Sequence, residues 1–301
     1  MDLIKPGISL DFVGKMKYAI IFSAVLIIIC IGSLIFRGGL NLGIDFAGGT
    51  IVQVKFQNDI SADQIRSALK STTLENSIIQ QFGTNEFLIR TAEMLHDQEL
   101  LNANVQKPLS TAFNEDYEIR RIEVVGSKVG MDFQRKAIFA VIVSWLAMLI
   151  YIAWRFEFRY GLGGIIAIIH DVIIIIGVVS ILKIEFTITI LAALFFIIGF
   201  SINDTIVVLD RIRENVKLHS RKTLADLINL SINQTLSRTI LTSLTVFLTV
   251  LSLYFFGGPV IHDLSVALLV GVIIGTYSSI FIACTIVLYF EKTQPAKAKG
   301  K

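Results

Sequence analysis

Residues 187–209 read TITILAALFFIIGFSINDTIVVL, and this stretch decides the class of fold. Most of its side chains are apolar, and Asp204 is its only charged residue. A membrane-spanning helix needs about 20 mostly apolar residues, which this stretch supplies. We therefore interpret it as a transmembrane helix that carries one carboxylate inside the bilayer.

The rest of the chain has the same character on both sides of this helix. Hydrophobic residues make up 54% of the 301 residues and charged residues 17%, whereas soluble domains carry about a quarter charged residues. Only residues 38–135 have the composition of a soluble domain. We predict six transmembrane helices, at residues 18–36, 137–154, 161–182, 187–209, 239–256 and 264–290. The first is too long for the apolar core of a signal peptide, and no small-residue cleavage site follows it.

The positions of lysine and arginine predict how the helices are oriented. Basic residues lie in the N-terminal segment 1–17, between the second and third helices, in the loop 210–238 and in the tail 291–301. The short loops on the opposite side hold one, Lys183. Because basic residues favour the cytoplasmic side, we expect cytoplasmic termini and an extracytoplasmic (periplasmic) domain at residues 37–135. Residues 224–230 fit either an amphipathic helix in the membrane interface or a solvated connecting helix.

The segment between the first two helices alternates strand and helix signals. Residues 50–56 (TIVQVKF) alternate like a strand, and Ser61 with Gln64 resembles the capping box of a following helix. The predicted order is strand 50–56, helix 61–70, strands 77–82 and 86–90, helix 96–113 and strand 117–125. Pro108 is expected to kink or end the second helix. This βαββαβ order is the ferredoxin-like split pattern, an α+β fold that serves many functions, so we interpret the domain as a protein-contact or scaffold module.

Asp204 lies in a stretch that we predict to cross the bilayer, where a charged group is costly and is usually paired or functional. At 1.5 Å per residue it lies about 9 Å inside the cytoplasmic end of its helix. Ser201, Asp204 and Thr205 share one helix face, and Asn203 lies on the neighbouring flank. Arg238 begins the fifth transmembrane helix, and its long side chain can extend to the depth of Asp204.

Two interpretations of this pair stay open. Burial disfavours the charged form of a carboxylate and a nearby cation favours it, so moving Arg238 away from Asp204 would favour protonation. That is the basis of a proton-coupled switch. Alternatively, a static buried ion pair fixes only the packing of two helices. His170 and Asp171, near the middle of the third transmembrane helix, leave a similar choice between an interhelical hydrogen-bond anchor and part of a proton path.

Two motifs indicate a family. Residues 43–50 (GIDFAGGT) and residues 199–215 (GFSINDTIVVLDRIREN) closely resemble signature segments of SecF, a family of bacterial protein-export membrane proteins. The arrangement of one helix, one external domain and five further helices is similar over the whole chain. By this resemblance, the family's intramembrane aspartate and arginine fall on Asp204 and Arg238. The motif that leads into the external domain consists of Gly43, Asp45, Phe46, Gly48, Gly49 and Thr50.

The resemblance implies a role in protein export. SecF-like proteins lie in the bacterial inner membrane, pair with a SecD subunit in a bundle of the resistance-nodulation-division type, and assist the SecYEG translocon. They are expected to use the proton gradient, with protons as the coupling ion and no bound cofactor or metal, to draw an unfolded preprotein across the lipid bilayer. No nucleic-acid partner is expected. The supporting polar residues are then His170, Asp171, Ser201, Asn203 and Thr205.

Two other functions stay open at this point. A proton-driven small-molecule exporter shares the bundle type, although the external region is small for one. A purely structural translocon subunit needs no proton coupling. The sequence shows no nucleotide-binding loop, nucleophile elbow or metal motif, which argues against an enzyme.

Overall fold

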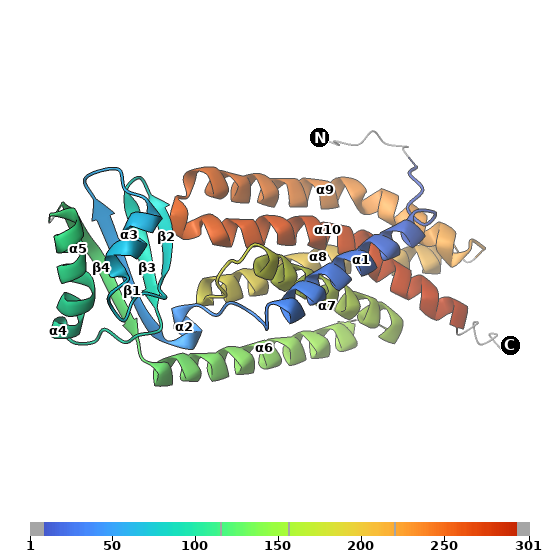
Figure 1. The fold of residues 1–301 in the computed structure, drawn as a ribbon. Helices are drawn as coiled ribbons and strands as arrows, with labels where there is room; N and C mark the ends of the chain where they lie inside the picture. Colours follow the sequence, from blue (N-terminus) through green and yellow to red (C-terminus); the bar gives the residue numbers. More distant parts are fainter. Residues whose placement is uncertain (1–8, 115, 156, 220, 294–301) are drawn as a thin grey trace.

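The computed structural model describes residues 9–114, 116–155, 157–219 and 221–293. Within these residues, six helices are long and apolar enough to cross a membrane, as predicted. They are α1 (Met16–Phe36), α6 (Ser127–Arg155), α7 (Phe158–Ile181), α8 (Ile188–Leu218), α9 (Leu224–Phe256) and α10 (Pro259–Thr293). Figure 1 shows them as one bundle with the smaller domain at one end. Lys5, Lys297, Lys299 and Lys301, used to predict the orientation, lie outside the described residues.

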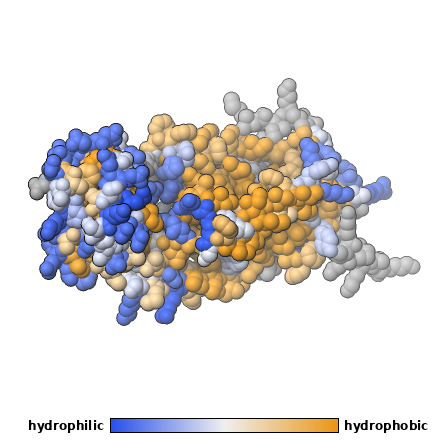
Figure 2. Space-filling view, viewed as in Figure 1, coloured by the Kyte–Doolittle hydropathy of each residue, from blue (hydrophilic) through white to orange (hydrophobic). Residues whose placement is uncertain are grey.

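The surface of the bundle is apolar between two hydrophilic ends (Figure 2). Helix α1 begins and helix α10 ends at the end opposite the domain (Figure 1). Helices α7 and α10 are the most buried, whereas α6 is almost entirely exposed along the outside of the bundle. The protein is therefore a multi-pass membrane protein whose polar domain lies at one membrane surface.

Several helices extend beyond the apolar runs that predicted them. Helix α8 continues to Leu218, and α9 begins at Leu224 with Thr223 as its N-cap. The predicted loop 210–238 is therefore mostly helical, and α6 begins at Ser127, inside the range predicted for the domain. Hydropathy marks the part of a helix within the bilayer, whereas the helix itself ends only at a cap or a break.

Small residues bring the central helices into close contact. A Cβ on Gly271 would overlap the side chain of Ile197, and one on Gly275 would lie 3.0 Å from the Ser201 Cβ, so α10 packs tightly on α8. A Cβ on Gly163 of α7 would lie 2.8 Å from the carbonyl oxygen of Ala283 of α10. The small residues Gly271, Gly275 and Ala283 of α10 thus serve close packing of the helices.

The domain contains a four-stranded sheet. Its elements are β1 (Gly49–Phe56), α3 (Ala62–Leu69), β2 (Ile78–Gly83), β3 (Glu86–Thr91) and β4 (Tyr117–Val125). The strand order is β2-β3-β1-β4 and each neighbouring pair is antiparallel, which is compatible with the predicted split pattern. A short helix, α2 (Ile44–Ala47), precedes β1 and was not predicted.

Pro108 neither ends nor breaks the second helical segment of the domain. This segment runs through α4 (Gln98–Leu101), a π-helical turn η1 (Asn102–Gln106) and α5 (Lys107–Phe113). The wider π turn lies directly before Pro108, where an α-helical carbonyl would clash with the proline ring. The segment begins at Gln98, with Asp97 as its N-cap, and not at residue 96 as predicted.

The two faces of the sheet differ. On one face, Val52, Val54, Phe87 and Ile89 are fully buried against the domain's helices. On the other, Gln53, Leu88 and Arg90 face the bundle across a cleft. The domain therefore has its own hydrophobic core and presents its polar sheet face to the membrane helices.

Candidate functional site

Asp204 is buried where three helices meet. Asp204, on α8, is only 3% exposed. Its Oδ2 accepts a hydrogen bond from Ser243 Oγ of α9 at 3.3 Å. Thr276 of α10 approaches Ser243 Oγ at 2.7 Å. The carboxyl group is therefore linked by hydroxyls to both neighbouring helices, as expected for a polar group inside a bundle.

Arg238 does not form an ion pair with Asp204 in this conformation. Both residues are described, and no contact within 4.0 Å joins their charged groups, although Arg238 is near enough to attract the carboxylate electrostatically. Arg238 instead lies exposed beside a cavity of about 380 Å³ between α8 and α9. The other lining residues are Ile206, Val207, Asp210, Arg211, Glu214, Gln234 and Thr235.

The other polar residues of the α8 motif separate into buried and exposed ones. Ser201 and Thr205 are fully buried, and Thr205 Oγ1 lies 2.8 Å from Ser279 Oγ of α10. Asn203 lies on an exposed face of the helix. Spacing along a helix thus placed Ser201 and Thr205 correctly inside the bundle.

His170 and Asp171 form the centre of a second buried network, which joins four helices. Asp171 is 1% exposed, and its Oδ2 accepts hydrogen bonds from Ser201 Oγ of α8 at 2.6 Å and Ser278 Oγ of α10 at 2.8 Å. Its Oδ1 lies 3.0 Å from Nδ1 of His170. The other ring nitrogen, Nε2, lies 3.0 Å from Ser23 Oγ of α1.

The sequence analysis did not identify five hydroxyl residues of these two networks. They are Ser23, Ser243, Thr276, Tyr277 and Ser278. Single hydroxyl residues in apolar runs look like packing residues, and only the relative rotation of the helices decides which acid each one meets. Among the described residues, no group of three or more His, Cys, Asp or Glu side chains is arranged to hold a metal ion. Buried carboxyl and imidazole groups linked by hydroxyls can bind and release protons.

The glycine motif after α1 shapes the start of the domain. Gly48 and Gly49 have φ angles of +77° and +130°, in the region that favours glycine. A Cβ on Gly49 would also overlap the carbonyl oxygen of Thr91. Thr50, which follows, is fully buried, and its Oγ1 donates to the carbonyl of Glu93 at 2.7 Å.

The first half of the same motif is attached to the loop that begins α8. The backbone of Gly43 donates to the carbonyl of Phe186 at 3.0 Å, and the Phe46 ring stacks on the Phe186 ring at 5.8 Å. Asp45 Oδ2 accepts a hydrogen bond from the backbone N–H of Ile188 at 3.0 Å. A carboxylate at a helix N-terminus is favourable, so the motif ties the domain to the helix that carries Asp204.

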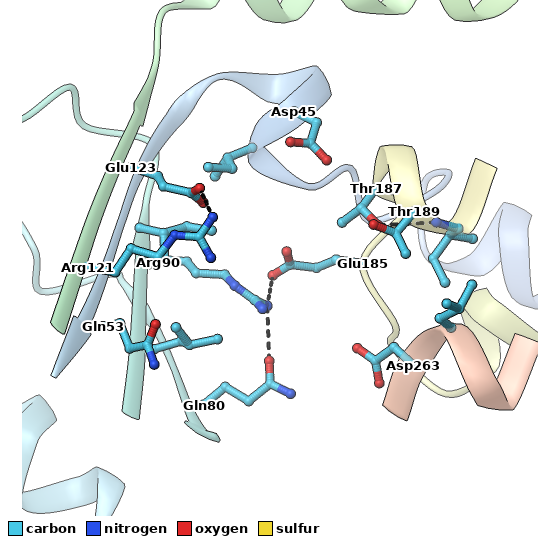
Figure 3. Close-up of a pocket in the computed structure, with 15 residues that line it drawn as sticks. Asp45, Gln53, Gln80, Arg90, Arg121, Glu123, Glu185, Thr187, Thr189 and Asp263 are labelled. Carbon is cyan, nitrogen blue, oxygen red and sulfur yellow. Dashed lines mark hydrogen bonds and ion pairs between the residues drawn. The ribbon is translucent and has the colours of Figure 1, made fainter. Parts of the chain in front are cut away.

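An ion pair joins the sheet to the bundle at the cleft. Arg90 of β3 contacts Glu185, in the loop before α8, at 2.6 Å, and also donates to Gln80 (Figure 3). The cleft has a volume of about 320 Å³, and Arg121, Glu123 and Asp263 also line it. Sequence reasoning missed this pair because its two residues come from segments far apart in the chain.

Comparison with known families identifies both motif regions. The family model described as "Protein export membrane protein SecD/SecF, C-terminal" matches residues 105–293. The model "SecD/SecF GG Motif" matches residues 33–60, which include the glycine motif.

Individual relatives cover nearly the whole chain. The protein translocase subunit SecF of Calditerrivibrio nitroreducens is 44% identical over 95% of this chain and 96% of its own length. The SecF subunit of Haemophilus influenzae is 41% identical over 92% and 84%. The crystal structure of SecDF, a translocon-associated membrane protein from Thermus thermophilus, matches 97% of this chain with a TM-score of 0.86 and 36% identity. This chain spans 40% of that longer chain, and a SecDF structure in a super-membrane-facing form matches with a TM-score of 0.72. The chain belongs to the SecF family of protein translocase subunits.

Proposed function

We propose that this SecF-family chain acts in the bacterial inner membrane as an accessory subunit of the Sec machinery, and that it uses the proton gradient to promote preprotein translocation. One observation carries the proton coupling. Among the described residues, the buried carboxyl group of Asp204 is hydrogen-bonded only to Ser243. A buried ionised carboxylate needs a cation or several donors to offset its lost hydration. Asp204 has neither in contact, so its surroundings suit a proton-carrying acid.

Arg238 supplies the second state of the switch. When Asp204 is ionised, it attracts Arg238 and draws α8 and α9 together at this depth; protonation removes that attraction. One charge that crosses about 100 mV provides about 2.3 kcal/mol. At 1.4 kcal/mol per factor of ten, this biases a two-state element about 50-fold.

The cavity beside Arg238 supports exchange of protons with the cytoplasm. Its lining residues all lie between Asp204 and the end of the bundle opposite the domain, and Asp210, Glu214 and Gln234 make it polar. The excess of basic residues at this end supports its assignment to the cytoplasmic side. The domain at the other end is then periplasmic.

The outer face of α8 and α9 supports a SecD-like partner. Asn203, Arg238, Thr245 and Thr249 are exposed there in the isolated chain. Polar and ionisable residues within transmembrane segments usually face protein or water and not lipid. The solved relatives are named SecDF, and the SecD-like subunit is the partner we expect to cover this face.

The domain junction supports transmission of the switch to the preprotein. Asp45 is bound to the first turn of α8, and Arg90 is paired with Glu185 just before that helix. A shift of α8 therefore moves the attachment of the domain. In this mechanism the domain alternately grips and releases an unfolded chain as it emerges from the SecYEG translocon.

The test is gradient-dependent export by membrane vesicles that contain the chain, a SecD-like subunit and the translocon. Asp204→Asn keeps the size of the side chain and removes its ionisation, so we expect the gradient-dependent part of translocation to be lost. The matched control is Asp226→Asn, on the exposed cytoplasmic end of α9, which should keep it. Full gradient dependence in Asp204→Asn would end the proton-coupling proposal, and wild-type export that ignores the gradient would favour a structural subunit. Crosslinks from the domain to a translocating preprotein distinguish export from small-molecule transport.

A further inference from the structure

We propose that His170 and Asp171 together form a second proton-binding site, distinct from Asp204, which holds helix α1 against the bundle in one protonation state and releases it in another. The inference deepens the proposed function and rests on it. The direction of each hydrogen bond around the pair fixes where its protons are located.

The donors can be assigned from the outer end of the network. The hydroxyl of Tyr277 donates its single proton to the carbonyl of Ala19 at 2.6 Å, since a carbonyl only accepts. Ser23, 2.9 Å from the Tyr277 oxygen, must therefore donate its own proton to that oxygen. Because the proton of Ser23 is used, Nε2 of His170, 3.0 Å from Ser23 Oγ, must carry a hydrogen and donate it.

The other end of the network fixes the carboxyl group in the same way. Oδ2 of Asp171 accepts from the hydroxyls of Ser201 and Ser278 at 2.6 and 2.8 Å. Ser278 Oγ also lies 3.1 Å from the carbonyl oxygen of Gly275, which is the longer of its two contacts, so we assign its proton, like that of Ser201, to Oδ2. Oδ2 then carries no proton of its own. Any proton on the acid must lie on Oδ1, which faces Nδ1 of His170 at 3.0 Å.

One mobile proton consequently lies between Nδ1 and Oδ1. It gives either an imidazolium beside a carboxylate or a neutral ring beside a neutral acid, and in both cases the pair has no net charge. A second proton, taken from water, would leave hydrogens on both facing atoms across 3.0 Å, with a net charge of +1. The contact cannot hold two hydrogens, so the pair must open, and the ring of His170 turns away from Asp171.

Opening the pair would detach α1. The ring of His170 is the link from Asp171 to Ser23, and it stacks beside Tyr277, which holds Ala19. Further along the same contact with α7, the hydrogen bonds between the two helices are longer. Ser33 Oγ lies 3.3 Å from Ser180 Oγ, and Arg37 donates to the carbonyl of Ile181 at 3.2 Å.

A shift of α1 reaches the domain directly. The chain continues from α1 through Gly38 and Gly39, which have positive φ angles, to Asn41 and Gly43. These last two are hydrogen-bonded to Phe186 in the loop between α7 and α8. The pair thus acts on one attachment of the domain to the bundle, the chain that leaves α1, while α8 acts on another.

Other titratable groups also lie close to the pair. Tyr277 faces it from α10, Asp204 lies one helical turn after Ser201 on α8, and Cys30 of α1 contacts the carbonyl of Ile174 one turn after Asp171. Of these three, only Asp204 is a carboxylic acid, so a test has to separate Asp204 from Asp171.

Infrared difference spectra of the full chain in lipid vesicles, recorded from about pH 8 to pH 5, separate the two acids, since histidine ordinarily titrates in this range. Ring-labelled histidine identifies the histidine bands, and His170→Gln assigns those of His170 among the four histidines. We expect a carboxylic acid band and a His170 band that change at one common pH. Both should disappear in Asp171→Asn and persist in Asp204→Asn.

The inference is overturned if the band of His170 in the wild-type protein reports one protonation state over the whole pH range. This outcome does not depend on whether any variant folds. Ser23→Ala provides a second check, because it removes the acceptor of Nε2–H together with the Ser23–Tyr277 hydrogen bond and should shift the common midpoint. Ser33→Ala, at the same helix contact, should leave it unchanged. If Asp204→Asn keeps gradient-dependent export while the His170 band behaves as expected, the proposed function fails and the proton-binding site stands.

The release of α1 has its own measurement. Spin labels at Tyr18 of α1 and Phe158 of α7, both highly exposed, report the separation of the two helices. The native cysteines Cys30 and Cys284 are buried. We expect a longer or broader distance at low pH in the wild type and no change in Asp171→Asn. An unchanged wild-type distance overturns the claim that the pair controls α1.

Discussion

Replacing Glu185 by alanine should loosen the attachment of the domain to the bundle. Arg90 and Glu185 have side chains that are 18% and 11% exposed, with 2.6 Å between their charged atoms. Removing one partner of a fully buried pair costs about 3–5 kcal/mol, whereas an exposed pair contributes about 0–1 kcal/mol. For this partly buried pair we expect about 1–3 kcal/mol, which raises the undocked population about 5- to 150-fold.

Amide hydrogen exchange of the complete protein in lipid measures that population. The reporters are the backbone N–H groups of Gly43, Phe186 and Ile188, which bind Phe186, Asn41 and Asp45 across the junction. Where opening is fast relative to exchange, protection should fall by the same 5- to 150-fold factor. Glu123→Ala is the matched control, because Glu123 pairs with Arg121 on its own strand and should leave protection unchanged. Equal protection in Glu185→Ala and the control would refute the reasoning.

Three further outcomes follow from the structure. Gly177→Ala places a Cβ onto Cys30 of α1, so the free energy of unfolding, measured by thermal unfolding, should fall by about 1–3 kcal/mol. Adding Cys30→Gly should restore part of that loss, and wild-type stability in the single variant would contradict the close contact. Gly49→Ala forces a strained φ and a clash with the Thr91 carbonyl; a cost of about 1–3 kcal/mol should appear as lower thermal stability, whereas wild-type stability would show that the strand start can rearrange. Arg238→Gln should reduce gradient-dependent export about tenfold if its attraction for Asp204 is about 1.4 kcal/mol, while Arg238→Lys should keep most of it; equal export by all three proteins would exclude a role for the charge.

The transmembrane helices were predictable because each needs only a local apolar run. The same holds for the sheet, where alternating residues in 50–56 and the capping box at Ser61 and Gln64 are local signals that the structure contains. The length of α8 and α9 was not predictable from hydropathy, because both helices continue into polar sequence up to a cap.

The buried network was predictable only in part. Asp171 and Asp204 are conspicuous in apolar sequence, but which hydroxyl faces which acid depends on how the helices are rotated. Ser201 illustrates this: it shares a helix face with Asp204, yet its hydroxyl binds Asp171. Arg238 shows that side-chain length does not determine contact: its side chain was expected to extend to Asp204, and it instead lies beside the cavity that Asp210 also lines.

The central claim is that Asp204 carries the coupling proton, and proton flux measures it most directly. Vesicles that contain this chain with a SecD-like partner and the translocon are loaded with a pH-sensitive dye, and acidification is followed while a preprotein is translocated. We predict that Asp204→Asn abolishes the preprotein-dependent flux that Asp226→Asn retains. Wild-type flux in Asp204→Asn would contradict the account.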